Sequence, residues 1–422
     1  MKITKENAKI SKFDIEYNKL VEQIINEGEL FENRTGVDTL SVEGVNFKFE
    51  DIEHNFPILE SKKVFIKNAL SEILWIHQAQ SNNVSWLKER GNNIWNEWEI
   101  DPDGIYRIYE PVNEIKTDST YKIYQGDNTI EEGPIEVVDI NGNVVLDKYN
   151  KPLTASSMIE GKKLKKAIYF GKEWAGTIGT AYGWINNKYK RPQYVLRQLK
   201  ENPNDRRMNI ILWQDEYIKS AVLPPCVWGT EWKVSNGKLH CYVHQRSADV
   251  GLGLPFNVSQ YAILQRLFAK VSNLEAGNLN YSIMDAHIYV THLEQMKKQL
   301  NWYKKMQYYS DFINRASLNT IMGMLTSLEY EEDKLRRYIL ENTDNESANK
   351  HYDEVSNNLK IVRLLLNKRK PILEIKNNYN FFNIDNKVNN DKEYLKENPT
   401  GNKDIKLLNY SSMPYINMPI VQ

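Results

Sequence analysis

Residues 223–257 read LPPCVWGTEWKVSNGKLHCYVHQRSADVGLGLPFN, and this stretch decides the expected fold. Apolar side chains recur along residues 228–234 and 239–243, which predicts two strands. The Ser235-Asn236-Gly237 turn between them is typical of a β-hairpin, because asparagine and glycine accept positive φ angles. The stretch therefore indicates a sheet that carries polar residues at the ends of its strands.

The same stretch holds a cluster of chemically useful residues. Pro224 and Pro225 restrict the backbone ahead of Cys226, so that the thiol lies at a stiff corner. Arg246 and Ser247 follow the second strand, and a guanidinium beside a hydroxyl suits a phosphate dianion. A single cysteine in a strand is more often a packing residue, and an Arg-Ser pair is more often at the surface. The occurrence of Cys226, Arg246 and Ser247 in this order within one short stretch predicts an enzyme that acts on a small phosphorylated substrate.

The composition allows a large folded core and excludes some classes of protein. The chain has 422 residues, of which 41% are hydrophobic and 11% aromatic, so global disorder is not expected. Its 55 Lys and Arg balance 55 Asp and Glu, which gives no general attraction to nucleic acid or an anionic membrane. With two cysteines, Cys226 and Cys241, and no apolar signal segment or membrane-spanning run, we expect a soluble cytoplasmic protein, in the host cytoplasm if viral.

Hydrophobic periodicity predicts several elements around this stretch. An amphipathic helix ends at Gly28, and residues 39–50 alternate in a way that indicates two short strands. A helix is expected over residues 260–272, with its apolar side chains facing inward.

A further helix over residues 67–80 has a wide apolar face that includes Glu72. A carboxylate on the buried side of a helix is costly unless it is hydrogen-bonded, and burial raises its pKa toward neutrality. Glu72 is therefore a functional candidate. The alternative is a glutamate at the helix edge that reaches water.

Several blocks, in the same order, resemble the signature motifs of the thymidylate synthase family. They are PPC, QRSADVGLGLPFN and DAHIYVTH, supported by ALSEILW around Glu72 and by the final MPYINMPIVQ. The resemblance covers residues 17–98, 178–300 and 366–422. It implies an α/β (α+β) fold, a large mixed β-sheet flanked by helices, in one catalytic domain spanning residues 1–422. Residues 101–177 and 302–366 depart from the pattern, and we expect a small β-rich insertion in the first and a helical insertion in the second.

The resemblance implies that dUMP and 5,10-methylenetetrahydrofolate, as co-substrate, become dTMP and dihydrofolate without a metal. Cys226 would add to carbon 6 of uracil as a thiolate. Asn257, which offers both a donor and an acceptor, would read the edge of uracil. Glu72 and Tyr182 would move protons. A competing register places the tyrosine at Tyr169, but Ile178-Gly179 and the Tyr-Gly pair favour Tyr182.

The same resemblance implies binding roles for other residues. Phosphate contacts are expected from Arg34, Arg246 and Ser247, and from Arg206 and Arg207 of a second subunit, which implies a homodimer with shared active sites. His287 and Tyr289, two apart on a strand, would share a face and bind the sugar. Asp249, Trp95 and Lys62 would contact the folate, with Lys63 an equal candidate for Lys62.

Two alternatives remain open at this level. Val227 follows Cys226 and Met284 precedes the aspartate of the DAHIY block, and both depart from the common family pattern. A deoxyuridylate hydroxymethylase would share the scaffold and the first steps, with water in place of hydride in the last. A binding or regulatory protein could also keep the scaffold, although neither insertion interleaves aromatic and basic residues, so nucleic acid is not expected as a partner.

Overall fold

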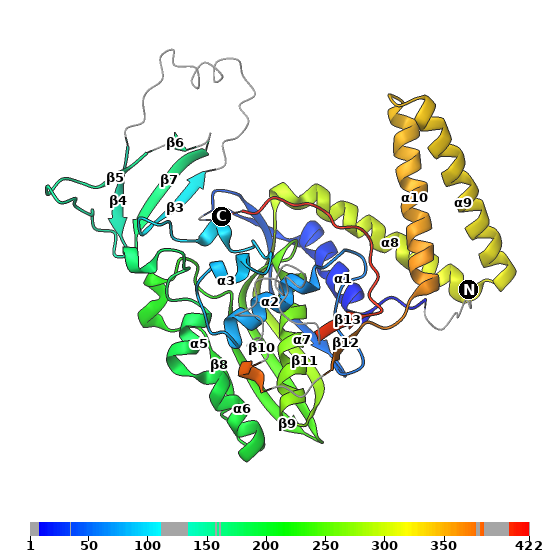
Figure 1. The fold of residues 1–422 in the computed structure, drawn as a ribbon. Coiled ribbons are helices and arrows are strands. Elements are labelled where there is room, and N and C mark those ends of the chain that lie inside the picture. The colour runs from blue at the N-terminus through cyan, green and yellow to red at the C-terminus, as the bar shows by residue number, and fades with distance from the viewer. Residues whose placement is uncertain are drawn as a thin grey trace, which may run out of the picture.

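The computed structural model describes residues 8–33, 35–110, 134–156, 158–159, 162–376, 380–383 and 405–421. In this part of the chain the largest sheet has six strands in the order β1-β2-β11-β10-β9-β8 (Figure 1). They are β1 (Glu29–Phe31), β2 (Thr39–Phe49), β8 (Asn209–Ile211), β9 (Val227–Ser235), β10 (Lys238–Asp249) and β11 (Glu275–Tyr289). Only β10 and β11 run parallel among these neighbours, so the sheet is mixed. The expected α/β fold with a large mixed sheet is confirmed.

The expected hairpin is present. Strands β9 and β10 pair antiparallel with Ser235 opposite Lys238, and Asn236 and Gly237 have φ angles of 50° and 71°. These angles explain the choice of asparagine and glycine at the turn. The ladder shifts register between His244 and Gln245, just before the polar residues of β10 begin. Such a bulge redirects side chains at the end of a strand.

One strand prediction is wrong. Residues 39–50 were expected to form two short strands, but residues 39–49 form the single strand β2, in which Gly44 has a φ of 70°. The alternation of buried and exposed side chains breaks around this glycine, which is why the sequence indicates two strands. Because β2 pairs with β11 from Thr39 to Phe49, tertiary pairing keeps it continuous through the break.

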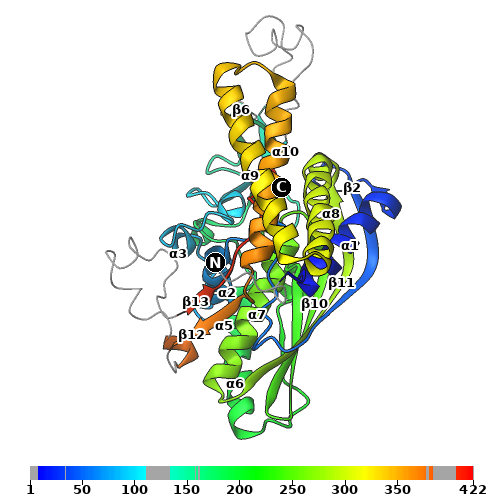
Figure 2. The ribbon, with the colours of Figure 1, turned by 90° about the vertical axis from the view of Figure 1, so that its right-hand side faces the viewer.

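Three helices form the core against this sheet: α1 (Lys12–Glu27), α2 (Ile66–His77) and α7 (Gly253–Val271). Helix α7 connects the parallel strands β10 and β11 and packs on both, α2 packs on α7, and α1 packs on β2 (Figures 1 and 2). Helix α1 ends at Gly28 as expected. The other helical elements of the body are α3 (Ser85–Lys88), η2 (Asn96–Trp98), η3 (Lys172–Trp174), α5 (Gly183–Tyr189), α6 (Arg191–Glu201), η4 (Asp215–Ser220), η5 (Val290–His292) and η6 (Phe381–Asn383).

Helix α7 begins seven residues before the expected position at Gln260. Leu252 precedes its first turn without a side-chain cap, so the sequence carries no start signal. Pro255 lies in the first turn, where its missing N–H is not needed for an intrahelical bond. As a result Asn257 is a helical residue, and Asn257 and Gln260 project from neighbouring positions on one face.

Residues 101–177 carry a separate small sheet with its own apolar cluster. Its strands are β3 (Ile105–Glu110), β4 (Ile135–Asp139), β5 (Thr154–Ala155), β6 (Met158–Ile159) and β7 (Lys162–Tyr169). They pair in the order β3-β7-β4-β5, and β6 pairs with β7. Ile105, Val137, Ala155, Leu164 and Ala167 are buried between them. The small sheet lies beside the main body, at the upper left of Figure 1.

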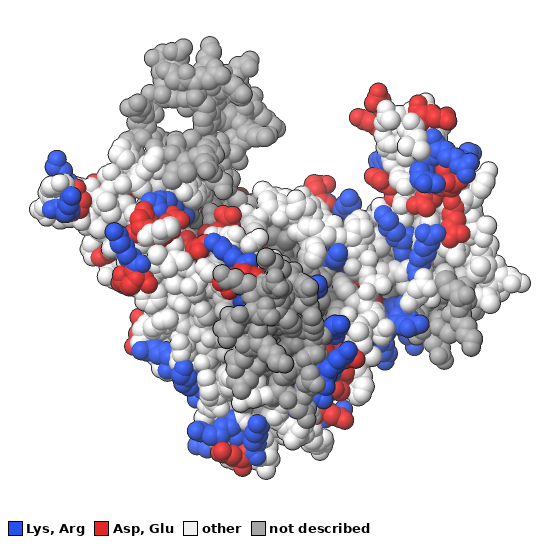
Figure 3. Space-filling view, viewed as in Figure 1, with Lys and Arg blue, Asp and Glu red and all other residues white. Residues whose placement is uncertain are grey.

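Residues 293–367 form three long helices, α8 (Leu293–Arg315), α9 (Leu318–Glu341) and α10 (Glu346–Asn367). Helices α9 and α10 pack as an antiparallel pair that extends away from the body (Figures 1 and 2). Both signs of charge are interspersed on its outer end (Figure 3). Among the described residues, no helix combines the length and apolar character needed to cross a bilayer.

The C-terminal segment returns from the helical pair to the body. Strands β12 (Ile372–Ile375) and β13 (Ile405–Leu408) pair antiparallel, and the chain then runs past the loop before α2. The backbone N–H of Met413 donates to the carbonyl of Glu60 at 2.7 Å. The carboxylate of Glu60 pairs with Lys368, which follows α10, and both side chains are at least nine-tenths buried. One loop thus anchors both the helical pair and the C-terminal segment.

Candidate active site

A large cavity lies between the main sheet, α2, the start of α7 and the C-terminal segment. Its volume is about 1830 Å³, and its described lining residues come from positions as far apart as Phe31 and Val421. The sequence-predicted residues that line it are Glu72, Trp95, Tyr182, Cys226, Arg246, Ser247, Asp249, Asn257, His287 and Tyr289. The structure therefore brings most of the predicted site residues to one place.

Cys226 lies on the cavity wall beside the guanidinium of Arg246. The nearer guanidinium nitrogen is 3.7 Å from Sγ, and Arg246 is fixed because it also donates to the carbonyls of Pro224 at 3.0 Å and Pro225 at 3.1 Å. The two prolines thus hold the arginine through their oxygens as well as stiffening the corner. A fixed cation beside a cysteine is the environment in which proteins stabilise a thiolate.

Tyr182 contacts the same corner through its hydroxyl group. Its hydroxyl oxygen accepts a hydrogen bond from the backbone N–H of Cys226 at 3.0 Å. Burial is the main cause that raises the pKa of Tyr182 well above its ordinary value, so the phenol is protonated. Tyr182 has a φ of 45°, an uncommon conformation for this residue that is typical of functional sites. Tyr169, the competing candidate, ends β7 and is not among the described lining residues.

Glu72 is buried and hydrogen-bonded at both oxygens. Oε1 accepts from the indole N–H of Trp95 at 2.8 Å, and Oε2 accepts from the amide of Gln260. Burial raises the pKa of Glu72 to about 7, although the two hydrogen bonds oppose that rise. A carboxyl group with this pKa can release or accept a proton near neutral pH. The reading of Glu72 as a helix-edge residue in water is wrong.

A chain of hydrogen bonds connects Glu72 to Asn257 and continues beyond it. The amide of Asn257 donates to Gln260 at 3.1 Å, and its oxygen accepts from Gln245 at 3.2 Å. Gln245 in turn accepts from the hydroxyl of Tyr281 at 2.5 Å. Since Glu72 only accepts when ionised, it fixes which way each amide of the chain points. Sequence reasoning missed Gln245, Gln260 and Tyr281, although the i, i+3 spacing of Asn257 and Gln260 was a usable signal.

Asp285 is another residue that the sequence analysis did not select. It accepts hydrogen bonds from Ser41, from Ser247 at 3.0 Å and from Nδ1 of His287 at 3.0 Å. Burial alone would raise the pKa of Asp285, but the bonds from His287, Ser41 and Ser247 outweigh it and lower the pKa. Asp285 and His287 are two residues apart on β11, so their side chains lie on the same face of the strand, as those of His287 and Tyr289 were expected to do.

The candidate folate residues fall into two groups. Trp95 and Asp249 line the cavity, and Oδ1 of Asp249 accepts from the N–H groups of Gly251 at 2.8 Å and Leu252 at 3.1 Å. Lys62, by contrast, is fully buried, and its ammonium donates to the carbonyl of Gly251. Burial lowers the pKa of Lys62 to about 8. The expected contact of Lys62 with the folate is not supported by this position.

Lys63 is better placed than Lys62. Its ammonium lies 5.0 Å from the ring centroid of Phe65, which lines the cavity. The sequence left these two neighbours as equal candidates. In the structure Lys62 is buried and Lys63 is exposed, which distinguishes the two candidates.

The arginines expected at the phosphate are not all in one place. Arg34 lies outside the described residues. Arg206 and Arg207 are exposed and do not line the cavity of their own chain, and Arg207 pairs with Asp205 at 2.9 Å. Only Arg246 of the four is therefore placed at the cavity by the described residues.

The C-terminal segment forms one wall of the cavity. Tyr415 and residues 417–421 line it, and the ring of Tyr415 lies 5.1 Å from that of Phe65. The carbonyl of Pro419 contacts Nε2 of buried His292 at 2.7 Å. These contacts hold the segment over the cavity.

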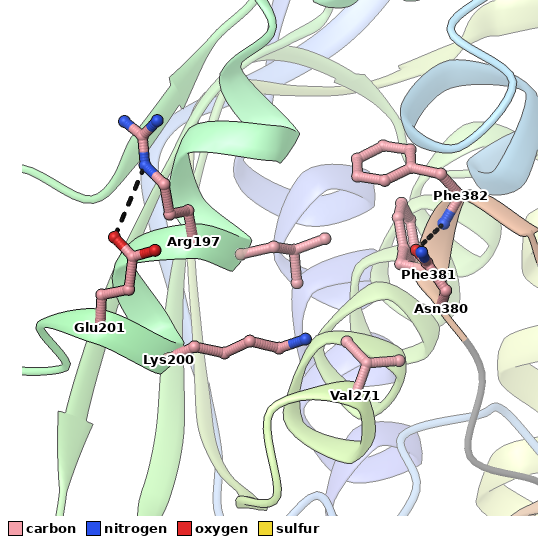
Figure 4. Close-up of a pocket in the computed structure, with 8 residues that line it drawn as sticks. Arg197, Lys200, Glu201, Val271, Asn380, Phe381 and Phe382 are labelled. Carbon is pink, nitrogen blue, oxygen red and sulfur yellow. Dashed lines mark hydrogen bonds and ion pairs between the residues drawn. The ribbon is translucent and has the colours of Figure 1, made fainter.

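A second, smaller cavity lies between α6, the end of α7 and η6 (Figure 4). Its volume is about 200 Å³, and its polar lining includes Arg197 and Glu201, whose ion pair spans 4.0 Å. Pairs of this kind are common on exposed helices, and the described residues that line this cavity include no cysteine, serine or histidine. Among the described residues, no cluster of three or more His, Cys, Asp and Glu side chains is positioned to hold a metal ion.

Comparison with known proteins agrees with the motifs. The family model described as thymidylate synthase matches residues 15–343. The thymidylate synthase of Clostridium beijerinckii is 34% identical over 291 residues, covering 69% of this chain and 82% of that protein. The thymidylate synthase of Staphylococcus haemolyticus is 33% identical over 300 residues, covering 69% and 86%.

A solved structure, thermostable thymidylate synthase A from Bacillus subtilis, is 30% identical, covers 68% of this chain and 84% of that one, and aligns with a TM-score of 0.47. The assignment rests on the family match and on the relatives. This chain belongs to the thymidylate synthase family.

Proposed function

We propose that this protein is a thymidylate synthase, which converts dUMP and 5,10-methylenetetrahydrofolate to dTMP and dihydrofolate. One observation carries the proposal: the thiol of Cys226 lies 3.7 Å from a fixed guanidinium nitrogen of Arg246, on the wall of a cavity of about 1830 Å³. Such a cavity accommodates a nucleotide and a second ligand together. The 34% identity to a thymidylate synthase over most of that protein supports the same reaction.

The arrangement suits addition of a thiolate to the uracil ring. Sγ of Cys226 forms a bond to carbon 6, and the electron pair of the double bond moves toward carbon 5 and the oxygen at carbon 4. Carbon 5 then attacks the methylene carbon carried by the folate. Tyr182, hydrogen-bonded to the backbone of Cys226, takes up the carbon 5 proton at its oxygen as its own hydroxyl proton passes to solvent, so the buried phenol stays neutral throughout. Elimination of the folate amine, hydride transfer and loss of the thiolate complete the reaction.

Glu72 and Asn257 serve the opposite edge of the ring in this proposal. Asn257 keeps one N–H and one lone pair beyond its bonds to Gln260 and Gln245, and these fit the N3–H and O4 of uracil. Glu72, with a pKa near 7 because it is buried, exchanges a proton with the O4 side of the ring.

The other predicted residues bind substrate groups. Arg246 and Arg34 neutralise the phosphate, Ser247 contacts it through its hydroxyl group, and His287 and Tyr289 bind the sugar hydroxyl. The ring of Trp95 and the carboxylate of Asp249 fit the pterin of methylenetetrahydrofolate, which supplies the one-carbon unit and the hydride. Both line the cavity beside the C-terminal segment, which excludes water.

A homodimer completes the site in this proposal. Arg206 and Arg207 are exposed and away from their own cavity, which fits a role at the phosphate bound by a second subunit. One sheet face offers a surface for that subunit, since Tyr242 and Met284 are 37% and 65% exposed and Trp228 stacks on His244 at 5.0 Å. Exposed aromatic and methionine side chains on a sheet face are typical of subunit interfaces.

The alternative product is 5-hydroxymethyl-dUMP, because Val227 and Met284 depart from the common family pattern next to Cys226 and Asp285. Incubation with dUMP and methylenetetrahydrofolate separates the two reactions. The synthase yields dihydrofolate, seen by its ultraviolet absorbance, and a nucleotide heavier by one methylene unit. A nucleotide heavier by one further oxygen, with tetrahydrofolate released, would assign the hydroxymethylase. Absence of both products from wild-type protein would contradict either enzyme and favour a non-catalytic binding protein.

A further inference from the structure

The small sheet reaches the large cavity. Tyr109 of β3 and Lys165 of β7 line it together with residues of the main body. Among the described lining residues, Arg246 is the only arginine and Lys165 the only lysine. The lining also includes the carboxylates of Glu43 and Glu97, so the cavity wall carries both signs of charge.

A β-bulge gives Lys165 its direction. In the pairing of β3 with β7, Ile108 lies opposite Lys166 and Tyr109 lies opposite Leu164, which leaves Lys165 without a partner in β3. Leu164 and Ala167, three residues apart, are both buried in the small core, whereas a regular strand would bury residues an even number apart. The extra residue therefore interrupts the alternation of buried and exposed side chains along β7, and Lys165 and Lys166 are both exposed. Bulges often redirect side chains in this way beside binding sites.

The ammonium of Lys165 lies beside the turn that leads into β2. A methyl group placed on Gly36 would be 3.8 Å from Nζ of Lys165. The turn is held by Asn33, whose side chain accepts from the N–H of Thr35 at 2.9 Å and donates to the carbonyl of Val37 at 2.9 Å. The Lys165 side chain is exposed where it lines the cavity, so a ligand in the cavity can reach its ammonium.

The position of Lys165 associates it with the nucleotide part of the cavity. The turn at Gly36 continues into β2, where Ser41 donates to Asp285. Asp285 also accepts from Ser247 and His287, the proposed phosphate and sugar contacts. Lys165 therefore lies beside the turn that leads into the strand supporting these contacts. A flexible lysine is suited to bind a dianion at the edge of such a site.

We propose that Lys165 binds the phosphate monoester of the nucleotide, as a contact that the small sheet adds to the active site. This inference rests on the proposed function and extends it, since it gives residues 101–177 a role in substrate affinity. The phosphate carries nearly two negative charges at neutral pH, and each nearby cation strengthens binding through a charge-assisted hydrogen bond.

The test compares Lys165→Met with Lys166→Met. Lys166 is the next residue on the same strand, is also exposed and is not among the described residues that line the cavity, so it is a matched control. We expect Lys165→Met to weaken dUMP binding by about 5- to 20-fold, measured by calorimetry, and to leave binding of uncharged deoxyuridine unchanged. Lys165→Arg should restore most of the affinity, and Lys166→Met should bind dUMP like the wild type.

The outcomes separate this inference from the proposed function. Equal dUMP affinity of wild type and Lys165→Met would overturn the role of Lys165 while leaving the enzyme assignment intact. A weaker affinity for polyglutamylated methylenetetrahydrofolate with unchanged dUMP binding would assign Lys165 to the folate tail and also overturn it. If wild-type protein does not bind dUMP at all, the proposed function fails first, and the inference fails with it.

Discussion

The backbone N–H of Cys226 donates a hydrogen bond of 3.0 Å to the hydroxyl oxygen of Tyr182, 44 positions earlier in the chain. The bond fixes the phenol next to the corner that carries the thiol. Any ring bonded to Sγ of Cys226 would therefore lie within reach of the Tyr182 oxygen. This geometry makes Tyr182 the natural proton acceptor in the proposed reaction.

Replacing Tyr182 by phenylalanine removes this acceptor and keeps the ring. We expect kcat to fall by about 100- to 10,000-fold, because general base catalysis contributes that much, while the affinity for dUMP changes little. Release of tritium from dUMP labelled at carbon 5 measures the affected step. Tyr169→Phe, at the end of β7, is the control and should retain full activity. Unimpaired tritium release by Tyr182→Phe would assign the proton to another group.

The Glu72→Gln variant tests how ionisation of the buried carboxyl group affects the free energy of unfolding. Burial raises the pKa of Glu72 from 4.5 to about 7, so the folded state holds the proton more tightly than the unfolded state. The stabilisation by that proton is complete below pH 4.5 and is lost as the pH rises through 7. Relative to wild type, the variant should therefore gain about 3 kcal/mol of unfolding free energy between pH 4.5 and pH 8.

Urea denaturation at several pH values measures this difference. Glu201→Gln, whose side chain is 66% exposed, is the control and should track wild type within about 0.5 kcal/mol at each pH. A difference between Glu72→Gln and wild type that does not vary with pH would refute the raised pKa. Activity of Glu72→Gln should fall at every pH, because the amide cannot exchange a proton.

Lys368→Met tests the buried ion pair that anchors the helical pair to the loop before α2. Burial raises the pKa of Glu60 to about 7 even though Lys368 opposes that rise, so loss of the lysine leaves an unpaired buried carboxylate at pH 8. We expect a loss of about 3 to 5 kcal/mol in unfolding free energy at pH 8. The loss should shrink toward pH 5, because the folded state then keeps the carboxyl protonated.

Lys304→Met provides the matched comparison. Lys304 pairs with Glu22 at 2.7 Å, but the two side chains are 54% and 45% exposed, so its replacement should cost less than about 1 kcal/mol. Similar losses for the two variants at pH 8 would mean that the Glu60 and Lys368 pair is not buried in solution.

Mixing two inactive variants tests the shared active site. Cys226→Ala lacks the nucleophile, and Arg207→Ala lacks the arginine proposed to serve the partner's phosphate. After co-refolding in equal amounts, half of the dimers pair the two variants, and each contains one site with both wild-type residues. Activity should therefore return to about a quarter of the wild-type level. Absence of recovery, with heterodimers verified by mass, would exclude a role of Arg207 in the active site of the partner subunit.

Local sequence signals predicted those features that depend on neighbours in the chain. The β9–β10 hairpin follows from its Asn236-Gly237 turn, and the buried position of Glu72 follows from helical periodicity. The start of α7 could not be predicted from the sequence, because Leu252, which precedes the helix, provides no side-chain cap to mark it. The break in alternation at Gly44 did not divide β2 into two strands, because pairing with β11 keeps the strand continuous.

Side chains that act through distant partners were harder to predict. Lys62 was expected at the folate, yet it is buried because its ammonium donates to the carbonyl of Gly251, 189 positions away. Gln245 and Tyr281 join the active-site chain through a contact between two strands. Lys165 reaches the cavity because of a bulge, which no alternation pattern in the sequence reports.

The wall formed by Tyr415 and residues 417–421 has a consequence for biosynthesis. A ribosome produces these residues after every other described part of the cavity. A nascent chain can therefore pair β2, β9, β10 and β11 while the folate side of the cavity is still open to water. Affinity for the nucleotide would then arise during translation before catalytic competence does, since sealing the cavity must wait for the segment that follows β13.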